Sequence, residues 1–326
     1  MKIIGTGSAH PKCAVTNEML EKFLDTSDEW ITERTGIKER CVISSEKLED
    51  LAVIAANKAL EDAGLTAADI DFIICSNVVN EYVTPALSCI IQGKIGATCP
   101  TVDINAACAG FVFAMDMAED KIQCKKAKNI LIVCAEEPSR MVSWKNRSTC
   151  VLFGDGAGAM VVTASEDGID DVISIDIRSD GSIGDLISLE LAGQNCPLVE
   201  PREEKSQFIK MNGKEVYRFV ARVLPEYVEQ LVANAGMKNE DIDYLIPHQA
   251  NMRIIQAVQE RLGYSDEKVV TNIERFGNTS AASIPLALVE SVEQGKVKLG
   301  STAILTGFGA GMTWGGAIVR LREGIC

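Results

Sequence analysis

The sequence predicts an α/β protein made of two pseudo-symmetric halves, each with a mixed or mostly parallel sheet layered with helices. Two observations carry this prediction. Continuous apolar segments of strand length, such as Asn129–Cys134, alternate with helical patterns, which is typical of sheets covered on both faces. In addition, the segment Glu61–Phe72 resembles Ala233–Tyr244, so the chain contains an internal repeat.

The repeat extends to the neighbouring elements. Each copy follows a helical pattern, over residues 48–63 in the first half and 214–235 in the second, and each pattern ends in Ala-Gly, a helix stop signal. A short apolar strand follows in both copies, Phe72–Cys75 and Tyr244–Pro247. One supersecondary unit therefore occurs twice, which favours a duplicated α/β domain.

The order of later strands supports the same reading. The segment Ile130–Val133 corresponds to Ala303–Thr306, and Gly158–Val162 corresponds to Gly316–Arg320. Three matching segments in the same order make chance similarity an unsatisfactory explanation. Two such halves packed face to face would bring their strand ends and helix N-termini around one cleft.

The boundary between the halves is predicted within residues 165–172, giving an N-terminal half of 1–168 and a C-terminal half of 169–326. The chain has no Pro/Ser-rich linker there, so the halves are expected to be fused rather than tethered. The N-terminal half would carry a nucleophilic cysteine, and the C-terminal half a histidine and an asparagine.

Composition excludes several classes of function. A net charge of −14 argues against nucleic-acid binding, which needs a basic surface. No apolar run approaches the about 18 residues of a membrane span, and the N-terminus lacks the apolar stretch of a signal peptide. Eleven cysteines without a CxxC pair suggest reduced thiols in a cytoplasm, and two histidines make a Cys/His metal site improbable.

Cys108 is the residue that says most about chemistry. It stands in Asp103–Phe111, where an apolar strand turns into a helix rich in small residues. The positive end of the helix dipole and the free backbone N–H groups there are expected to lower the thiol pKa and to hold an oxyanion. The competing interpretation is a small buried hydrophobe, which most of the other cysteines must be.

The second half offers partners for this thiol. His248 follows a predicted strand and precedes a helix, and Asn278 precedes another helix at roughly the position that Cys108 has in the first half. The segment Gly307–Gly316 is predicted to be a glycine-rich turn between two strands that allows close approach to a ligand. Asn278 could also be a plain helix N-cap. His10, in an N-terminal loop, is expected to be non-catalytic.

Two chemistries fit a Cys, a His and an Asn. In a papain-like hydrolase, the Asn orients the His and water is the final acceptor. In a decarboxylating condensation, the His and the Asn both donate to a thioester carbonyl and stabilise the enolate that forms when malonyl loses CO₂. The residues alone leave both open.

The chain as a whole resembles the thiolase superfamily and, within it, the β-ketoacyl-acyl-carrier-protein synthase III family. The resemblance covers nearly the whole chain, and six motifs in the same order make it specific. These motifs are Ser27–Ile37, Asp103–Cys108, Phe153–Gly158, Pro247–Asn251, Gly277–Ala282 and Gly307–Gly315. The implied fold is the thiolase-like duplicated fold with an αβαβα layer order.

The resemblance implies a role for each candidate residue. Cys108 would be the acylated nucleophile, and His248 and Asn278 would polarise the malonyl thioester. The oxyanion hole would be formed by the backbone N–H groups of Cys108 and of Ala310 in the Gly309–Ala310 turn. Ala310 stands where a glycine is common, which narrows the allowed backbone angles of the turn.

The resemblance also implies a coenzyme A site. Trp30 and Arg147 would sandwich the adenine, Arg34 would face the nucleotide phosphates, and Asn251 would belong to the same site. Coenzyme A enters as a thioester substrate, so no cofactor and no metal are expected.

The expected partners are acyl-CoA and malonyl-acyl carrier protein, an acidic protein. Lys214 and Arg253 would form its docking patch, to which Arg261 could belong, although Glu260 beside it weakens the patch. Members of the family are homodimers in which a partner residue shapes the acyl pocket. Thr84 stands where a bulky aromatic can occur, so we expect room for primers larger than acetyl.

The implied function is the decarboxylating condensation of an acyl-CoA primer with malonyl-acyl-carrier protein, which initiates fatty acid biosynthesis in the cytoplasm. The alternative is a related condensing enzyme of specialised metabolism with another acceptor. A synthase of the hydroxymethylglutaryl-CoA type would need a general-acid glutamate near the cysteine, and a type III polyketide synthase has a different cysteine context. A catalytically silent acyl-binding subunit does not fit an intact Cys108, His248 and Asn278.

Overall fold

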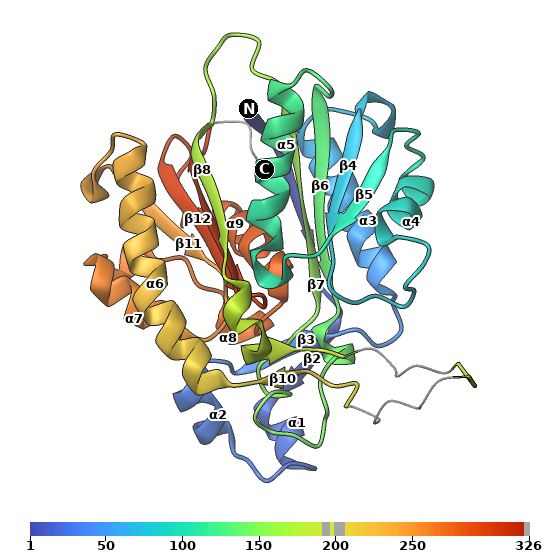
Figure 1. The fold of residues 1–326 in the computed structure, drawn as a ribbon, viewed down its shortest axis with the longest axis vertical. Coiled ribbons are helices and arrows are strands. Elements are labelled where there is room, and N and C mark those ends of the chain that lie inside the picture. Colours follow the sequence, from blue (N-terminus) through green and yellow to red (C-terminus); the bar gives the residue numbers. More distant parts are fainter. Residues whose placement is uncertain (191–195, 199–205, 323–326) are drawn as a thin grey trace.

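The computed structural model describes residues 1–190, 196–198 and 206–322. Two sheets dominate this part of the chain (Figure 1). The larger has the strand order β1-β7-β6-β4-β5 and the smaller the order β11-β12-β13-β8. The bounds of the larger sheet's strands are β1 Lys2–Ala9, β4 Phe72–Ser76, β5 Thr101–Ile104, β6 Asn129–Glu136 and β7 Gly156–Thr163. Those of the smaller are β8 Val172–Ser179, β11 Tyr244–Pro247, β12 Thr302–Gly309 and β13 Thr313–Arg320.

Pairing within the two sheets is mixed. Strands β4–β5, β4–β6 and β11–β12 pair in parallel, and the remaining neighbours in these sheets pair antiparallel. The prediction of mostly parallel sheets is therefore wrong, although a mixed fold is confirmed. A continuous apolar strand indicates that both of its faces are buried, but it does not indicate the direction of its neighbours. In this fold, helices cover both faces of antiparallel strand pairs as well as of parallel ones.

Helices form three layers around the two sheets. Helices α5 (Gly110–Gln123) and α9 (Ser283–Glu293) lie between the sheets and contact strands of both. Outside the larger sheet lie α3 (Leu48–Asp62) and α4 (Leu87–Ile95), and outside the smaller sheet lie α6 (Gly213–Asn234) and α7 (Met252–Leu262), as Figure 1 shows. The predicted αβαβα layering is confirmed.

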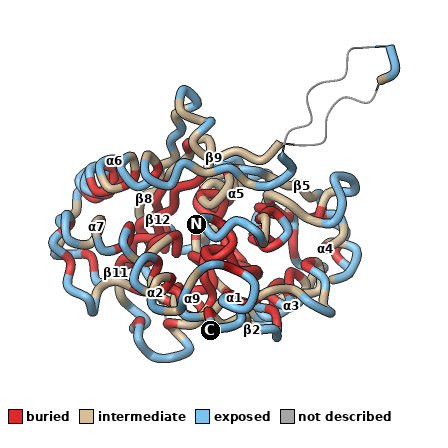
Figure 2. The backbone as a smooth tube through the Cα atoms, turned by 90° about the horizontal axis from the view of Figure 1, so that it is seen from below, coloured by how far each residue is buried: buried red, intermediate tan, exposed pale blue. Residues whose placement is uncertain are grey.

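Three apolar cores separate these layers. The central core, which includes Phe111 and Ile284, is shared by both sheets, and each outer core lies between one sheet and its covering helices. Figure 2 shows burial concentrated in the interior of the molecule and exposure along its outer elements. Because α5 and α9 are apolar on several sides, the helices predicted to follow the Cys108 and Asn278 segments become the middle layer of the fold.

Smaller elements form a cap at one end of the two sheets (Figure 1). An apolar cluster that includes Ile31 and Val151 holds them together. Their bounds are β2 Cys13–Thr16, α1 Asn17–Glu21, α2 Asp28–Thr35, β3 Glu39–Val42, β9 Ile187–Ser188, β10 Lys210–Met211 and α8 Ile273–Phe276. Strands β2 and β3 pair with each other, as do β9 and β10.

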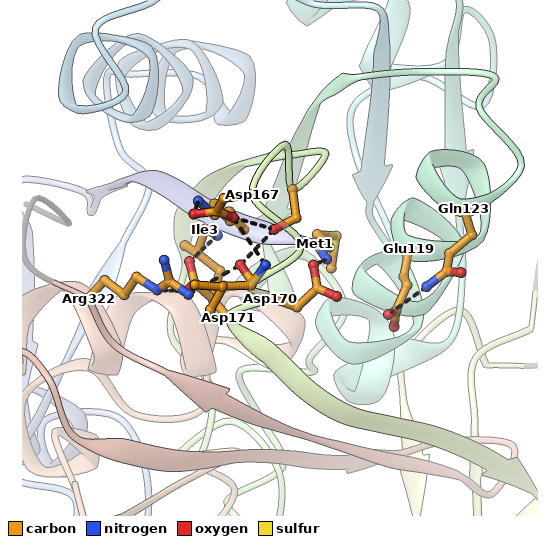
Figure 3. A network of polar contacts seen from close by, with 11 residues as sticks. Met1, Ile3, Glu119, Gln123, Asp167, Asp170, Asp171 and Arg322 are labelled. Atoms are coloured by element: carbon orange, nitrogen blue, oxygen red, sulfur yellow. Dashed lines mark hydrogen bonds and ion pairs between the residues drawn. The ribbon is translucent and has the colours of Figure 1, made fainter.

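The junction between the predicted halves is held by polar contacts to both described ends of the chain (Figure 3). Asp171, which is buried, accepts the backbone N–H of Ile3 at 3.0 Å and pairs with Arg322. The N-terminal amino group of Met1 pairs with Asp170. The strands of the larger sheet end at Thr163 and those of the smaller begin at Val172, on either side of this junction.

Candidate functional site

A cavity of about 1550 Å³ lies between the two halves. Cys108 from the first half and His248 and Asn278 from the second half all line it. In each half a short 3-10 segment stands directly ahead of a central helix, Ala107–Ala109 before α5 and Ser280–Ala282 before α9. The first of these segments follows β5 and the second follows α8, and the two contact each other. The structure thus brings together the three side chains that the sequence singled out.

Cys108 lies in the middle of its 3-10 segment, one turn ahead of α5. Its Sγ lies 3.4 Å from Oγ of Ser280. Burial raises the pKa of the Cys108 thiol to about 12, opposed by the Ser280 contact and by its own backbone N–H. The predicted lowering of this pKa is therefore wrong, since the cost of removing a thiolate from water exceeds the stabilisation from neighbouring donors.

His248 is buried at the end of β11. Its Nδ1 lies 2.7 Å from Oγ of Ser283, and its ring packs edge-to-face on Phe308 at 5.3 Å. Burial lowers the pKa of His248 to about 3, against a weaker opposite effect of the Ser280 backbone. The imidazole is consequently neutral at physiological pH and carries one N–H.

Asn278 follows Gly277, whose φ of 64° turns the chain into the cavity. The side-chain Oδ1 of Asn278 accepts the backbone N–H of Ser280 at 2.9 Å. The backbone N–H of Asn278 donates to the backbone carbonyl of Leu152 at 2.8 Å. The cap of the next 3-10 segment is Thr279, so Asn278 is not a plain N-cap. With Oδ1 engaged, the side-chain amide presents its NH₂ group as the free end.

Two residues that line the cavity, Cys108 and Ala310, have backbone N–H groups that could act as donors. Among the described loops and caps, no carbonyl accepts the N–H of Cys108 or of Ala310. Gly309 allows their close approach, because a Cβ there would lie 2.5 Å from the Cys108 nitrogen. The predicted long turn is mostly strand: β12 ends at Gly309 and β13 begins at Thr313. Ala310 takes no positive φ, so alanine fits this turn.

Part of the cavity is lined by residues of α2, Trp30 and Arg34. Trp30 has both Arg34 and Arg147 over its ring, each guanidinium carbon 5.0 Å from the ring centre. Arg147 also bonds the backbone carbonyl of Asp25 and lies 3.4 Å from its carboxylate. With its central carbon 5.0 Å from the ring centre, the Arg147 guanidinium packs on the indole, so a flat group could enter between them only if Arg147 moved aside.

Asn251 lines the cavity but is engaged at both ends of its side chain. Its Oδ1 accepts the N–H of Arg253 at 2.9 Å as the N-cap of α7, and its Nδ2 donates to the Arg34 carbonyl at 3.2 Å. It therefore ties α7 to α2.

The predicted carrier-protein residues lie at the mouth of the cavity. Lys214 and Arg253 are both exposed and both line it. Arg261 forms an ion pair with Glu226 at 3.0 Å, which offsets its charge. Of the three, Lys214 and Arg253 are placed to meet a ligand.

Sequence reasoning missed three buried groups around the thiol. Ser280 contacts Cys108, Ser283 contacts His248, and Glu136 lies fully buried at the end of β6. Ser280 belongs to the Gly277–Ala282 motif, and Ser283 directly follows it. The sequence around the two serines does not indicate which side chain each one contacts.

Other features bear on the class of protein. Within the described ranges, no group of His, Cys, Asp and Glu could hold a metal ion. None of the described helices is long and apolar enough to cross a membrane. Every cysteine that the structure describes is a free thiol.

Comparison with known families places two models on this chain. The model of 3-oxoacyl-[acyl-carrier-protein (ACP)] synthase III matches residues 102–181, and the model of its C-terminal part matches residues 232–321. These matches contain Cys108, His248 and Asn278.

Whole-chain relatives agree. The chain is 46% identical over 321 residues to the β-ketoacyl-[acyl-carrier-protein] synthase III of Clostridium perfringens, covering 98% of this chain and 99% of the relative. Among solved structures, that of 3-oxoacyl-[acyl-carrier-protein] synthase III from Aquifex aeolicus has a TM-score of 0.90 at 44% identity and covers 98% and 99% of the two chains. The Pseudomonas aeruginosa structure of the same name has a TM-score of 0.91 at 34% identity, with 99% and 98% covered.

Proposed function

Because the chain belongs to the β-ketoacyl-[acyl-carrier-protein] synthase III family, we propose that Cys108 carries the primer acyl group while His248 and Asn278 activate malonyl-acyl-carrier protein. The enzyme is an acyltransferase of the condensing type. It catalyses the decarboxylating condensation that initiates fatty acid biosynthesis. The alternative of a specialised-metabolism enzyme is not favoured, because full-length relatives at 41–46% identity carry the name of the fatty-acid enzyme.

In the first half-reaction, the Cys108 sulfur attacks the thioester carbonyl of acyl-CoA. The carbonyl oxygen becomes an oxyanion, which the N–H groups of Cys108 and Ala310 stabilise. Backbone donors fixed by packing need no rearrangement as charge develops, so they favour the tetrahedral intermediate over the substrate. Coenzyme A leaves as the thiol, and the acyl group remains on Cys108.

In the second half-reaction, malonyl-acyl-carrier protein enters and loses CO₂. The resulting enolate oxygen is held by two neutral donors, Nε2–H of His248 and the NH₂ group of Asn278. The Ser280 N–H on Oδ1 of Asn278 supports this role, since it leaves the amide nitrogen free. The enolate carbon then attacks the acyl group on Cys108, and the product is a β-ketoacyl-carrier protein.

The single observation that carries this proposal is the convergence of Cys108, His248 and Asn278 on one cavity between the halves. The indole of Trp30 and the guanidinium groups of Arg34 and Arg147 line the cavity together and supply the stacking surface and positive charge that suit the nucleotide of coenzyme A. Lys214 and Arg253 supply positive charge at the mouth for an acidic carrier protein, on an enzyme that otherwise carries −14.

The decisive experiment is intact-mass analysis after incubation with acyl-CoA. One added acyl group is expected on the wild-type chain and none on Cys108→Ala. Incubation with acetyl-, butyryl- or isobutyryl-CoA and malonyl-acyl-carrier protein then shows which primers give a β-ketoacyl-carrier-protein product. A cysteine hydrolase would release free acid without malonyl-acyl-carrier protein. Acylation that persists in Cys108→Ala would refute the mechanism.

We also propose a cytoplasmic homodimer that needs no cofactor or metal. Among the described strands, β5 is an edge of the larger sheet, and it bonds the start of α4, which the loop of the 90% exposed Val83 precedes. This side therefore offers open strand backbone and apolar surface to a second copy. Thr84 is exposed on the same loop, where it would shape the partner's acyl pocket. Light scattering tests the dimer, and activity after dialysis against a chelator tests the absence of a metal.

A further inference from the structure

Glu136 is a buried carboxyl group that the proposed mechanism does not use. It ends β6 and is fully buried. Its Oε2 accepts the backbone N–H of Val78 at 3.2 Å, and its Oε1 has no hydrogen-bond partner in the described part of the chain. An ionisable group buried with an unsatisfied oxygen is costly to keep, so its position calls for an explanation.

Ser280 stands beside the reacting thiol, in a segment that packs against the strand carrying this carboxyl group. The Ser280 hydroxyl lies 3.4 Å from Sγ of Cys108, and the segment Ser280–Ala282 packs against the end of β6. Burial raises the pKa of Glu136 to about 8. The backbone N–H of Val78 acts in the opposite direction and, more weakly, so do the Ser280 hydroxyl and the Ala281 N–H, which lie near the carboxyl group but outside hydrogen-bond geometry. The negative charge of Glu136 in turn helps to raise the pKa of Cys108.

The first half-reaction needs somewhere to put the thiol proton. Cys108 is protonated in its buried site, because its pKa is raised to about 12. His248 cannot hold the proton, since burial lowers its pKa to about 3. An acceptor with a pKa near the working pH is the most effective general base, and Glu136 is the group near Cys108 with that property.

We propose that Glu136 accepts the thiol proton of Cys108 through the hydroxyl of Ser280 as acyl-CoA acylates the enzyme. This rests on the proposed role of Cys108 as the acylated nucleophile. Ser280 touches the reacting sulfur, and Glu136 acts through Ser280. The proposal gives the unsatisfied oxygen of Glu136 a function in the chemical step.

The step balances in atoms and charge. The Cys108 proton passes to Ser280 Oγ while the Ser280 hydroxyl proton passes to the Glu136 carboxylate, and an S–C bond forms between Cys108 and the acyl carbon. The C–S bond to coenzyme A then breaks. The Ser280 hydroxyl then gives its proton to the departing coenzyme A thiolate and takes the proton back from Glu136, so coenzyme A leaves as the thiol and Glu136 is again a carboxylate.

The surroundings of Glu136 leave it as the acceptor. The charge of Glu136 raises the pKa of three thiols, those of Cys75 on β4, Cys134 on β6 and Cys108 beside α5. Burial raises the pKa of each thiol, so none competes for the negative charge. On β7 the residue paired with Glu136 is Gly156, which adds no charge. Among the described residues, the causes of the Glu136 shift are burial and neutral donors, with no contribution from a charged side chain.

The test measures the two half-reactions separately in Glu136→Gln. Glutamine has the shape of the protonated acid and keeps the Val78 contact. We expect the rate constant for acylation by acyl-CoA to fall at least about tenfold. Condensation of enzyme already acylated at Cys108 should change less than about twofold. Glu137→Gln is the matched control, because Glu137 is the next residue and faces Arg140 at 2.9 Å instead.

The pH profile separates proton transfer from structure. The acylation rate constant of the wild type should increase as the pH rises through about 8, because the Glu136 carboxylate is the active form. This pH-dependent limb of the profile should be absent in Glu136→Gln. Ser280→Ala removes the hydroxyl but keeps the backbone N–H that holds Asn278, and should reproduce the loss. Glu136→Asp should restore part of the pH limb. The double variant should be no slower than either single one, since both interrupt one path.

The proposal is overturned by an unchanged acylation rate in Ser280→Ala or Glu136→Gln, by equal losses in both half-reactions, or by a pH limb that survives both substitutions. Failure of the parent proposal looks different, because then Cys108→Ala would still become acylated. If Glu136→Gln does not fold, Ser280→Ala decides alone.

Discussion

Oγ of Ser283 lies 2.7 Å from Nδ1 of His248 and also accepts the backbone N–H of Gln249 at 3.3 Å. Since the Gln249 donor occupies one lone pair, the serine hydroxyl is free to donate to Nδ1. This keeps the single proton of the neutral imidazole on Nε2, the nitrogen that the proposed mechanism uses as a donor.

Removal of that hydroxyl should therefore weaken decarboxylation. Ser283→Ala leaves Nδ1 free to take the proton, and we expect the rate of malonyl decarboxylation to fall about 10- to 100-fold, with acylation of Cys108 nearly unchanged. The measurement is CO₂ release from pre-acylated enzyme. Ser291→Ala is the control, as Ser291 is another buried serine of α9, and its hydroxyl donates to the Leu288 carbonyl. An equal loss in both variants would contradict the tautomer argument.

Stability should depend on pH through His248. Its pKa is depressed from 6.5 to about 3 in the folded chain, so below about pH 6.5 the unfolded chain binds a proton that the folded chain does not. The free energy of unfolding should fall with decreasing pH in this window, by about 1.4 kcal/mol per pH unit at most. Denaturant titrations of wild type and His248→Gln give the slope. Identical slopes between pH 6 and 4 would show that the imidazole is not buried in its neutral form.

Alkylation should report the raised pKa of Cys108. Because burial holds the thiol protonated, its reaction with iodoacetamide should speed up about tenfold per pH unit between pH 6.5 and 9, without a plateau. Site-resolved mass spectrometry follows Cys108 beside the exposed Cys13 and Cys89, which serve as internal controls. A plateau below pH 8 would mean that the thiol is activated in the resting enzyme.

Gly309 should not tolerate a side chain. A Cβ there would lie 2.5 Å from the Cys108 nitrogen and 2.9 Å from Cβ of Ala107, so Gly309→Ala must push the nucleophile segment away from the Ala310 turn. We expect acylation to slow about 100-fold, the effect of losing one oxyanion donor. Gly93→Ala is the control, since nothing lies within 4 Å of its Cβ position. Wild-type acylation in Gly309→Ala would rule out the proposed oxyanion hole.

Trp30 should govern affinity for the nucleotide. Trp30→Ala removes the stacking surface that Arg34 and Arg147 cover, and the KM for acyl-CoA should rise about tenfold with little change in kcat. Steady-state kinetics with acyl-CoA measures this. A short acyl thioester without a nucleotide is the control and should react equally with both enzymes. If Trp30→Ala also reacted more slowly with that short thioester, the substitution would be disturbing the structure of α2 rather than nucleotide binding.

Much of the molecule follows from the sequence by itself. The repeat of Glu61–Phe72 in Ala233–Tyr244 determined a duplicated α/β fold, because the same local pattern of helix, stop signal and apolar strand folds the same way in each half. The motifs around Cys108, His248 and Asn278 determined the family for the same reason: they are local and can be read residue by residue.

The tertiary structure decided the electrostatics and the supporting contacts. The pKa of Cys108 is raised rather than lowered because its value depends on water excluded by both halves, which no local pattern records. The same holds for the Ser280 and Ser283 contacts and for Glu136, which join residues far apart in the chain. Strand direction was likewise decided by packing, because apolar strands covered on both faces are stable in either orientation.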